Sequence, residues 1–108
     1  MNQPFFPFEI MLTHIVVWKY RGDVKQAERE KHVALLRHLP SVIAEMESFS
    51  VGFDMLHLPR SYHTGLVATF RDRAALEAYT VHPEHTAVAY FGRSISEHVA
   101  SVDFESEE

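Results

Sequence analysis

Three side chains able to hold or move protons lie close together in the stretch AYTVHPEH, residues 78–85. Tyr79 offers a phenol, and His82 and His85 offer imidazoles on either side of Pro83. Proline disfavours helical backbone in the residue before it, so we expect a helix to end near His82 and a new one to begin at Pro83. Such a break could turn the Tyr79 phenol and the His85 imidazole toward one shared space.

A histidine and a tyrosine in one sheltered space can perform acid–base chemistry without a metal. We expect His85 in the first turn of its helix, where the helix dipole disfavours the imidazolium and keeps the ring able to accept a proton. Tyr79 could then donate a hydrogen bond to an oxygen that develops negative charge. The alternative is structural: His82 caps the following helix, and Tyr79 is an ordinary core aromatic.

The spacing of the two histidines also raises the question of a metal site. His82 and His85 flank Glu84 at a separation that resembles ligand spacing, and His14 could be a third donor. However, Pro83 interrupts the helical face that the histidines would have to share. We therefore predict no metal, and no cofactor, since the sequence also lacks a Gly-rich phosphate loop.

The composition restricts the classes of protein to which the chain can belong. Its 108 residues suit one domain, and a net charge of −5 without a basic stripe predicts no nucleic-acid partner. No run of residues is long and apolar enough to predict a membrane span. The lack of cysteine excludes thiolate catalysis and fits a cytoplasmic protein.

The elements that must position these residues begin with a strand, a helix and a second strand. Residues 13–20 are rich in β-branched and aromatic side chains, as strands are. Asp23 is in position to cap a helix over 24–39, which Pro40 interrupts. Residues 48–58 alternate between apolar and polar side chains, which indicates a half-buried strand.

The second half of the chain predicts a strand, two short helices and a last strand. Residues 63–70 return as a strand, and Asp72 is expected to cap a short helix. Pro83 suits the first position of the next helix, which Gly92 is expected to close. Residues 97–104 form the last strand, and the acidic end DFESEE is typical of a solvated tail.

This order predicts an α+β fold class, namely a ferredoxin-like β-α-β-β-α-β protomer with a four-stranded antiparallel sheet. In the first strand, Ile15 and Val17 face one way. His14, Val16 and Trp18 face the other way. Because the helices can cover only one apolar face, we expect a second copy to cover the other and form a homodimer. Alternatively, the N-terminal PFFPF folds over that face.

We predict three segments along the chain. Residues 1–10 are an N-terminal extension, residues 11–105 are the folded domain, and residues 106–108 are an acidic tail. The histidines outside the candidate site are expected near a turn (His57 and His63) or at partly exposed positions (His32, His38 and His98).

Three stretches resemble the stress-responsive α/β-barrel (Dabb) domain family. MLTHIVVWKY is similar to its opening strand, TFRDRAALEAYTVHPEH to its most recognisable block, and HVASVDFE to its closing strand. The resemblance covers about residues 11–105 and implies a ferredoxin-like protomer that pairs into a dimeric α/β barrel.

The resemblance extends to olivetolic acid cyclase-like proteins, which close a linear polyketide by aldol condensation without a cofactor. Carried over, their catalytic tyrosine and histidine fall on Tyr79 and His85, and a pocket histidine falls on His14. His85 would then be the general base, and Tyr79 would orient and stabilise the substrate oxygen.

Our leading hypothesis is a stress-responsive homodimer that binds a small organic molecule between sheet and helices and performs cofactor-free acid–base catalysis. A non-catalytic stress-related binding protein and a cofactor-independent oxygenase on the same barrel are the alternatives. The predicted site consists of His85 and Tyr79 as catalytic groups and of four residues for substrate binding, His14, Val16, Trp18 and His82.

Overall fold

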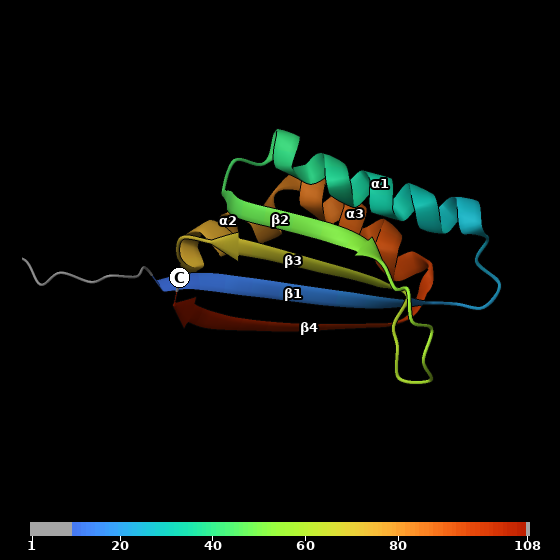
Figure 1. Ribbon diagram of the computed structural model, residues 1–108. Coiled ribbons are helices and arrows are strands. Elements are labelled where there is room, and N and C mark those ends of the chain that lie inside the picture. Colours follow the sequence, from blue (N-terminus) through green and yellow to red (C-terminus); the bar gives the residue numbers. More distant parts are fainter. Residues whose placement is uncertain (1–9, 108) are drawn as a thin grey trace, which may run out of the picture.

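A four-stranded sheet with three helices on one of its faces makes up residues 10–107, which the computed structural model describes (Figure 1). The elements are β1 (Ile10–Tyr20), α1 (Gln26–Val42), β2 (Met46–Phe53), β3 (Thr64–Phe70), α2 (Arg73–Val81), α3 (Pro83–Ser94) and β4 (Ser96–Glu107). The strands lie in the order β2-β3-β1-β4, and each neighbouring pair is antiparallel. The predicted ferredoxin-like α+β fold is confirmed.

The inner strand β1 determines which residues face the helices. It pairs with β3 on one side and with β4 over nearly its whole length on the other. Side chains alternate between the two faces of a strand, so His14, Val16 and Trp18 share the face that the helices cover. Trp18 is buried in the core on this face.

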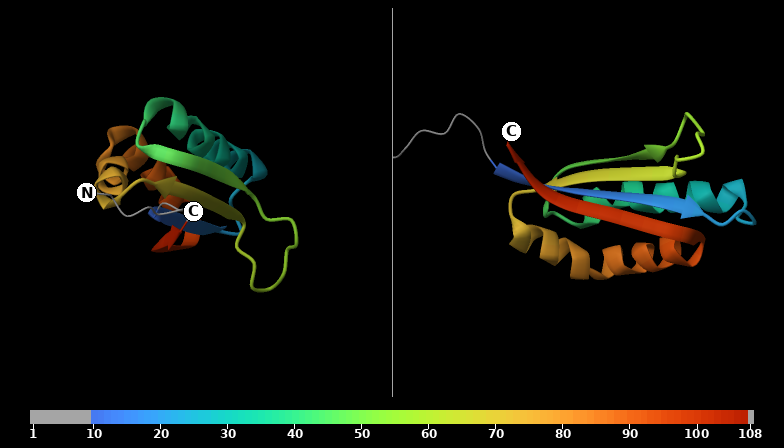
Figure 2. Two further views of the ribbon diagram at one scale, coloured as in Figure 1. Left: turned by 60° about the vertical axis from the view of Figure 1, so that its left-hand side comes forward. Right: turned by 90° about the horizontal axis from the view of Figure 1, so that it is seen from below.

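The core fills the space between the sheet and the helices. Figure 2 shows that the helices all lie on one side of the sheet. Leu66, Ala68 and Phe70 of β3 are buried there against Leu36 and Leu39 of α1. Each large apolar side chain removed from water contributes about 1.5–3 kcal/mol. This packing fixes the helices relative to the strands.

The predicted break between the second and third helices is confirmed. Asp72 caps α2, because its carboxylate accepts a hydrogen bond from the Ala75 amide at 2.9 Å. The helix ends at Val81, and His82 is extended, with φ −63° and ψ 133°. Pro83 then occupies the first turn of α3, where its missing N–H leaves no helical bond unmade.

The first helix differs from its prediction at both ends. Asp23 does not cap it: its carboxylate pairs instead with the Arg21 side chain at 3.2 Å, and the helix starts at Gln26. Pro40 lies inside the helix, which continues to Val42. A proline one turn from a helix end removes one hydrogen bond, and the buried residues on the core side of α1 hold the turn in place.

Two strands also differ from their predicted bounds. Strand β2 ends at Phe53, and the apolar residues after it belong to a loop in which His57 has a positive φ of 54°. Asp54 stabilises this loop, because its carboxylate accepts a hydrogen bond from the His57 amide. Strand β4 continues to Glu107, so most of the acidic end that we expected as a solvated tail pairs with β1.

His32, which we expected at a partly exposed position, is fully buried. Its Nδ1 is hydrogen-bonded to the Tyr20 hydroxyl at 2.8 Å, and that hydroxyl also bonds the Thr64 side chain at 2.8 Å. Helix α3 passes close by, since a Cβ on Gly92 would lie 2.4 Å from His32 Nε2. The prediction that Gly92 ends α3 is wrong, because the helix continues to Ser94.

The opposite face of the sheet is apolar, and no helix or strand within residues 10–107 covers it. Ile15 pairs with Val67 on one side and with Val102 on the other. Val67, Val102 and Phe104 are 41%, 52% and 44% exposed. The PFFPF stretch, our alternative cover for this face, lies outside the described residues.

Candidate functional site

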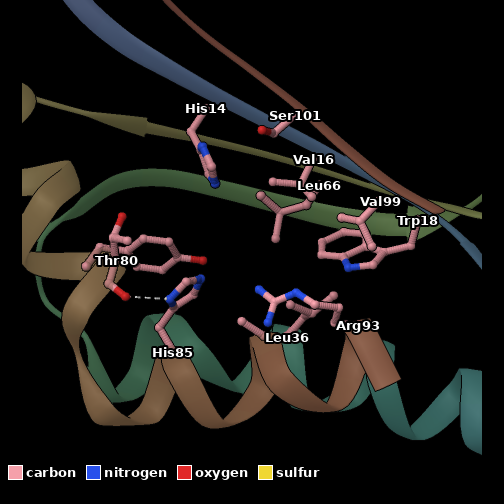
Figure 3. Close-up of a pocket in the computed structure, with 12 residues that line it drawn as sticks. His14, Val16, Trp18, Leu36, Leu66, Thr80, His85, Arg93, Val99 and Ser101 are labelled. Atoms are coloured by element: carbon pink, nitrogen blue, oxygen red, sulfur yellow. Dashed lines mark hydrogen bonds between the residues drawn. The ribbon is translucent and has the colours of Figure 1, made fainter. Parts of the chain in front are cut away.

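A cavity of about 200 Å³ lies between the sheet and the helices (Figure 3). Its polar lining consists of His14, Tyr79, Thr80, His85, Arg93 and Ser101. Its apolar lining consists of Val16, Trp18, Leu36, Leu66, Ala89 and Val99. Both helices after β3 and the two strands β1 and β4 therefore contribute side chains to one hollow.

The Tyr79 and His85 rings lie next to each other at one end of the cavity. Their centroids are 4.3 Å apart and their planes meet at 43°. Tyr79 belongs to the last part of α2 and His85 to the first turn of α3. The extended residue His82 introduces a kink between these helices, and Tyr79 and His85 lie on either side of it.

The protonation state of His85 follows from its surroundings. Its Nδ1–H donates a hydrogen bond to the Thr80 carbonyl oxygen at 3.0 Å, which leaves Nε2 unprotonated in the neutral ring. Burial is the largest effect and lowers the pKa of His85. The hydrogen bond to the Thr80 carbonyl opposes this shift, and the charges of His14, Arg93 and His82 each lower the pKa by a smaller amount. At neutral pH the ring is therefore a neutral base.

Tyr79 has the opposite property. Burial raises the pKa of its phenol to about 12, because the phenolate would lose its hydration in the core. The hydroxyl makes no hydrogen bond to another side chain or backbone group in residues 10–107. At neutral pH Tyr79 is thus a proton-bearing donor next to the unprotonated His85 ring.

A third ring completes the polar end of the cavity. His14 lies edge-on to Tyr79, with the ring centroids 6.1 Å apart. Its Nδ1–H donates to the carboxylate of Asp103, the residue directly across from it on β4. This bond orients the His14 ring and leaves its other nitrogen toward the cavity, where Figure 3 shows the ring pointing at the helices.

The structure brings five of the six predicted site residues together around the cavity. These are His14, Val16, Trp18, Tyr79 and His85. His82 does not line the cavity; its Nδ1 accepts a hydrogen bond from the Glu84 amide at 3.1 Å and so caps α3. This outcome matches the structural alternative for His82.

Sequence reasoning did not select Arg93, Thr80 or Ser101. Arg93 follows His85 by eight residues, which places the two on one face of a continuous helix. That spacing was readable, but only once the helix was known to extend past Gly92. Thr80 acts through its backbone carbonyl, for which its side chain gives no signal.

Within residues 10–107, no group of three His, Cys, Asp or Glu side chains is placed to hold a metal ion. In the same range, none of the helices combines the length and apolar character needed to cross a membrane.

Several solved structures share this architecture. A dimeric ferredoxin-like protein from Thermobifida fusca YX is 22% identical, with a TM-score of 0.81 over 96% of this chain and 97% of that chain. A dimeric protein of ferredoxin-like fold from Bacteroides fragilis is 28% identical, with a TM-score of 0.78 over 89% and 96%. The hydroxynitrile lyase of Passiflora edulis is 20% identical, with a TM-score of 0.82 over 94% and 97%.

The four-stranded antiparallel sheet with helices on one face defines a ferredoxin-like α+β protein, like the two similar proteins from Thermobifida fusca and Bacteroides fragilis. The model of the stress responsive A/B barrel domain, Dabb, matches residues 12–106, and the chain belongs to this family. No curated protein matches the chain.

Proposed function

We propose that this protein is a homodimer that binds a small organic molecule in the cavity and performs cofactor-free acid–base catalysis with His85 and Tyr79. The observation that supports this most directly is that the His85 and Tyr79 rings lie in contact, one without a proton on Nε2 and the other with its hydroxyl proton. Burial keeps His85 neutral and Tyr79 protonated at the same pH, so one can accept a proton while the other donates a hydrogen bond.

The reaction class that suits this pair is proton abstraction from a carbon next to a carbonyl group. Nε2 of His85 takes the proton, and the electron pair of the C–H bond moves onto the carbonyl oxygen to form an enolate. The Tyr79 O–H donates to that oxygen and stabilises its charge. In an aldol cyclisation the enolate carbon then attacks a second carbonyl of the same molecule, and the His85 imidazolium returns its proton to the new alkoxide.

The Thr80 carbonyl supports this cycle in both directions. It accepts the Nδ1–H of His85 whether the ring is neutral or charged, so the ring keeps its orientation while Nε2 gains and loses the proton. The apolar side chains of Trp18 and Leu36 lower the local polarity of the cavity, which strengthens the hydrogen bond from Tyr79 to the developing oxyanion.

Association of two chains through the open face of the sheet is part of the proposal. The apolar side chains on that face need cover, and the similar proteins from Thermobifida fusca and Bacteroides fragilis are described as dimeric. Several large apolar side chains buried there, at about 1.5–3 kcal/mol each, would favour a stable pair.

The test uses a panel of small β-keto acyl compounds with the wild type and the variants His85→Ala and Tyr79→Phe. We expect His85→Ala to reduce kcat by about 10²- to 10⁴-fold, the usual contribution of a general base, and Tyr79→Phe to reduce it by a similar or smaller factor. In the wild type, kcat/KM should rise with pH to a plateau with an inflection below 6.5, since the pKa of His85 is lowered.

His38→Ala is the matched control, because His38 is exposed on α1 and does not line the cavity. Circular dichroism should show that all variants are folded. A folded His85→Ala variant with the wild-type rate would rule out the catalytic role, and a panel without turnover would favour the non-catalytic binding protein.

A further inference from the structure

Arg93 is a positively charged side chain that lines the cavity without a partner. Within residues 10–107 its guanidinium forms neither an ion pair nor a hydrogen bond. Arg21, Arg29, Arg37 and Arg73 each make at least one such contact. Arg60 and Arg71 make none either in this part of the chain, but they lie outside this cavity, so Arg93 is set apart by its place in the cavity lining. Five N–H donors are therefore available at the edge of a pocket, in the planar arrangement that matches a carboxylate.

The position of Arg93 on α3 relates it directly to His85. His85, Ala89 and Arg93 recur every four residues and so lie along one face of the helix, which faces the cavity. Helical side chains lean toward the N-terminus, and Figure 3 shows the Arg93 side chain reaching back toward His85. The small Ala89 side chain leaves the space between them open.

Among the described residues that line the cavity, Arg93 is the one that carries a permanent charge. No Asp or Glu is among its lining residues. The carboxylate of Asp103 contacts the lining residue His14 and accepts a hydrogen bond from it. Arg93 is also one of the groups whose charge disfavours the His85 imidazolium. An anionic group on a bound molecule would therefore be attracted into this space.

The remaining lining restricts the body of such a molecule. Trp18 and Leu36 are buried apolar side chains on the walls of the same cavity, and Val99 contributes from β4. A volume of about 200 Å³ lies below the range of about 300–1,000 Å³ typical of sites for drug-sized ligands. The cavity suits a single ring or a short acyl chain.

We propose that the ligand of this cavity is a small carboxylic acid whose carboxylate binds the guanidinium of Arg93 and whose apolar body lies against Trp18 and Leu36. This inference rests on the proposed function. A carboxylate bound to Arg93 would leave the middle carbon atoms of the ligand beside His85, the proposed base. It adds a specificity residue, Arg93, that selects the anion and takes no part in proton transfer.

The experiment compares acids with uncharged molecules of the same shape. Benzoate, phenylacetate and hexanoate are titrated into isotopically labelled protein, each beside its primary amide, and NMR shifts of the cavity residues report binding. We expect each acid to bind about tenfold or more tightly than its amide at low ionic strength, because hydrogen bonds to a charged group are the stronger ones. The preference should decrease as salt is added.

Arg93→Gln should remove this preference while the amides bind as they do to the wild type. Arg71→Gln is the matched control, since Arg71 is exposed outside the cavity and its loss changes the net charge equally. Loss of the preference in both variants, its persistence in Arg93→Gln, or failure of all three acids to bind at millimolar concentration would overturn the inference.

Binding and turnover separate this inference from the proposed catalysis. His85→Ala should keep the preference for acids, because the guanidinium is unchanged, although it abolishes turnover. Acid-selective binding without turnover by the wild type would leave the role of Arg93 intact and refute the catalytic proposal. Turnover of neutral substrates with no preference for acids would support the catalytic proposal and refute the role of Arg93.

Discussion

The degree of burial determines the proton affinity of each ring in this protein. Burial lowers the pKa of His32 to about 4 and also lowers that of His85, whereas it raises the pKa of Tyr79 to about 12. The charged form of each ring is disfavoured for the same reason, although the direction of the shift depends on which form carries the charge. His32 and His85 differ in their surroundings: Nε2 of His32 is buried without a hydrogen-bond partner, whereas His85 lines a cavity.

The low pKa of His32 predicts that acid destabilises the fold. The unfolded chain binds a proton at its ordinary pKa of 6.5, and the folded chain binds it only near pH 4. The free energy of unfolding should therefore decrease as the pH falls from about 6.5 to 4, with a contribution of about 3 kcal/mol from this residue. Urea unfolding at several pH values measures it.

His32→Asn is the informative variant, because an amide can keep the hydrogen bond to Tyr20 and does not titrate in this range. It is expected to be less stable at neutral pH yet to lose less stability in acid than the wild type. The burial of His63 and His85 acts in the same direction, so some acid sensitivity should remain. Equal acid sensitivity of the variant and the wild type would contradict the assignment to His32.

At the scale of elements, the contact between α3 and the rest of the core depends on one residue without a side chain. A Cβ on Gly92 would lie 2.4 Å from His32 Nε2 and 3.1 Å from Trp18 Nε1. Both rings are buried, so a methyl group at position 92 would require the surrounding core to shift. Gly92 therefore allows α3, which carries His85 and Arg93, to approach the sheet closely.

Gly92→Ala should destabilise the protein by about 1–3 kcal/mol, even though alanine is the better helix former by about 1 kcal/mol. Thermal or urea unfolding measures the change. Gly22→Ala is the matched control, because a Cβ there meets no atom within 4 Å and its backbone φ is not positive. If both variants had the wild-type stability, the close approach of α3 would not be a constraint on the fold.

The element order was predictable because its signals are local. Asp72 before good helix formers and Pro83 after an extended residue mark helix ends wherever they occur. The errors arose where tertiary packing outweighs local preference: α1 continues through Pro40, and the polar stretch around His32 contains a buried ring. The start of α1 was wrong because Asp23 had a second possible partner, Arg21.

The candidate site was predictable to the extent that sequence neighbours carry it. Tyr79 and His85 lie on either side of one helix break, and His14 shares a strand face with Trp18. Arg93 was missed because its contribution depends on how α3 lies against the sheet. The pairing of His14 with Asp103 joins residues 89 positions apart, which no short motif encodes.

At the scale of the whole molecule, the uncovered face of the sheet is the most consequential feature. Val67 and Val102 flank Ile15 on that face and are about half exposed in the single chain. The helices lie entirely on the other side (Figure 2). A second copy of the chain would remove these side chains from water.

Val102→Glu should convert the proposed homodimer into a monomer, because a carboxylate without a partner is costly to bury in an apolar interface. The dissociation constant is expected to increase by about 100-fold or more, as measured by sedimentation equilibrium. Val81→Glu is the control, since Val81 is 73% exposed at the end of α2, away from this face. A monomeric wild type, or a Val102→Glu variant that still dimerises, would exclude this interface.

Strand β4 faces both regions at once. Val99 and Ser101 line the cavity, and Val102, the next residue along the chain, belongs to the open face. Any shift of this edge strand on self-association moves one cavity wall along with it. If pairing of the chains changes the affinity of the cavity for a ligand, thermodynamic linkage requires that the ligand changes the affinity between the chains by the same factor. The apparent affinity for the ligand would then vary with protein concentration.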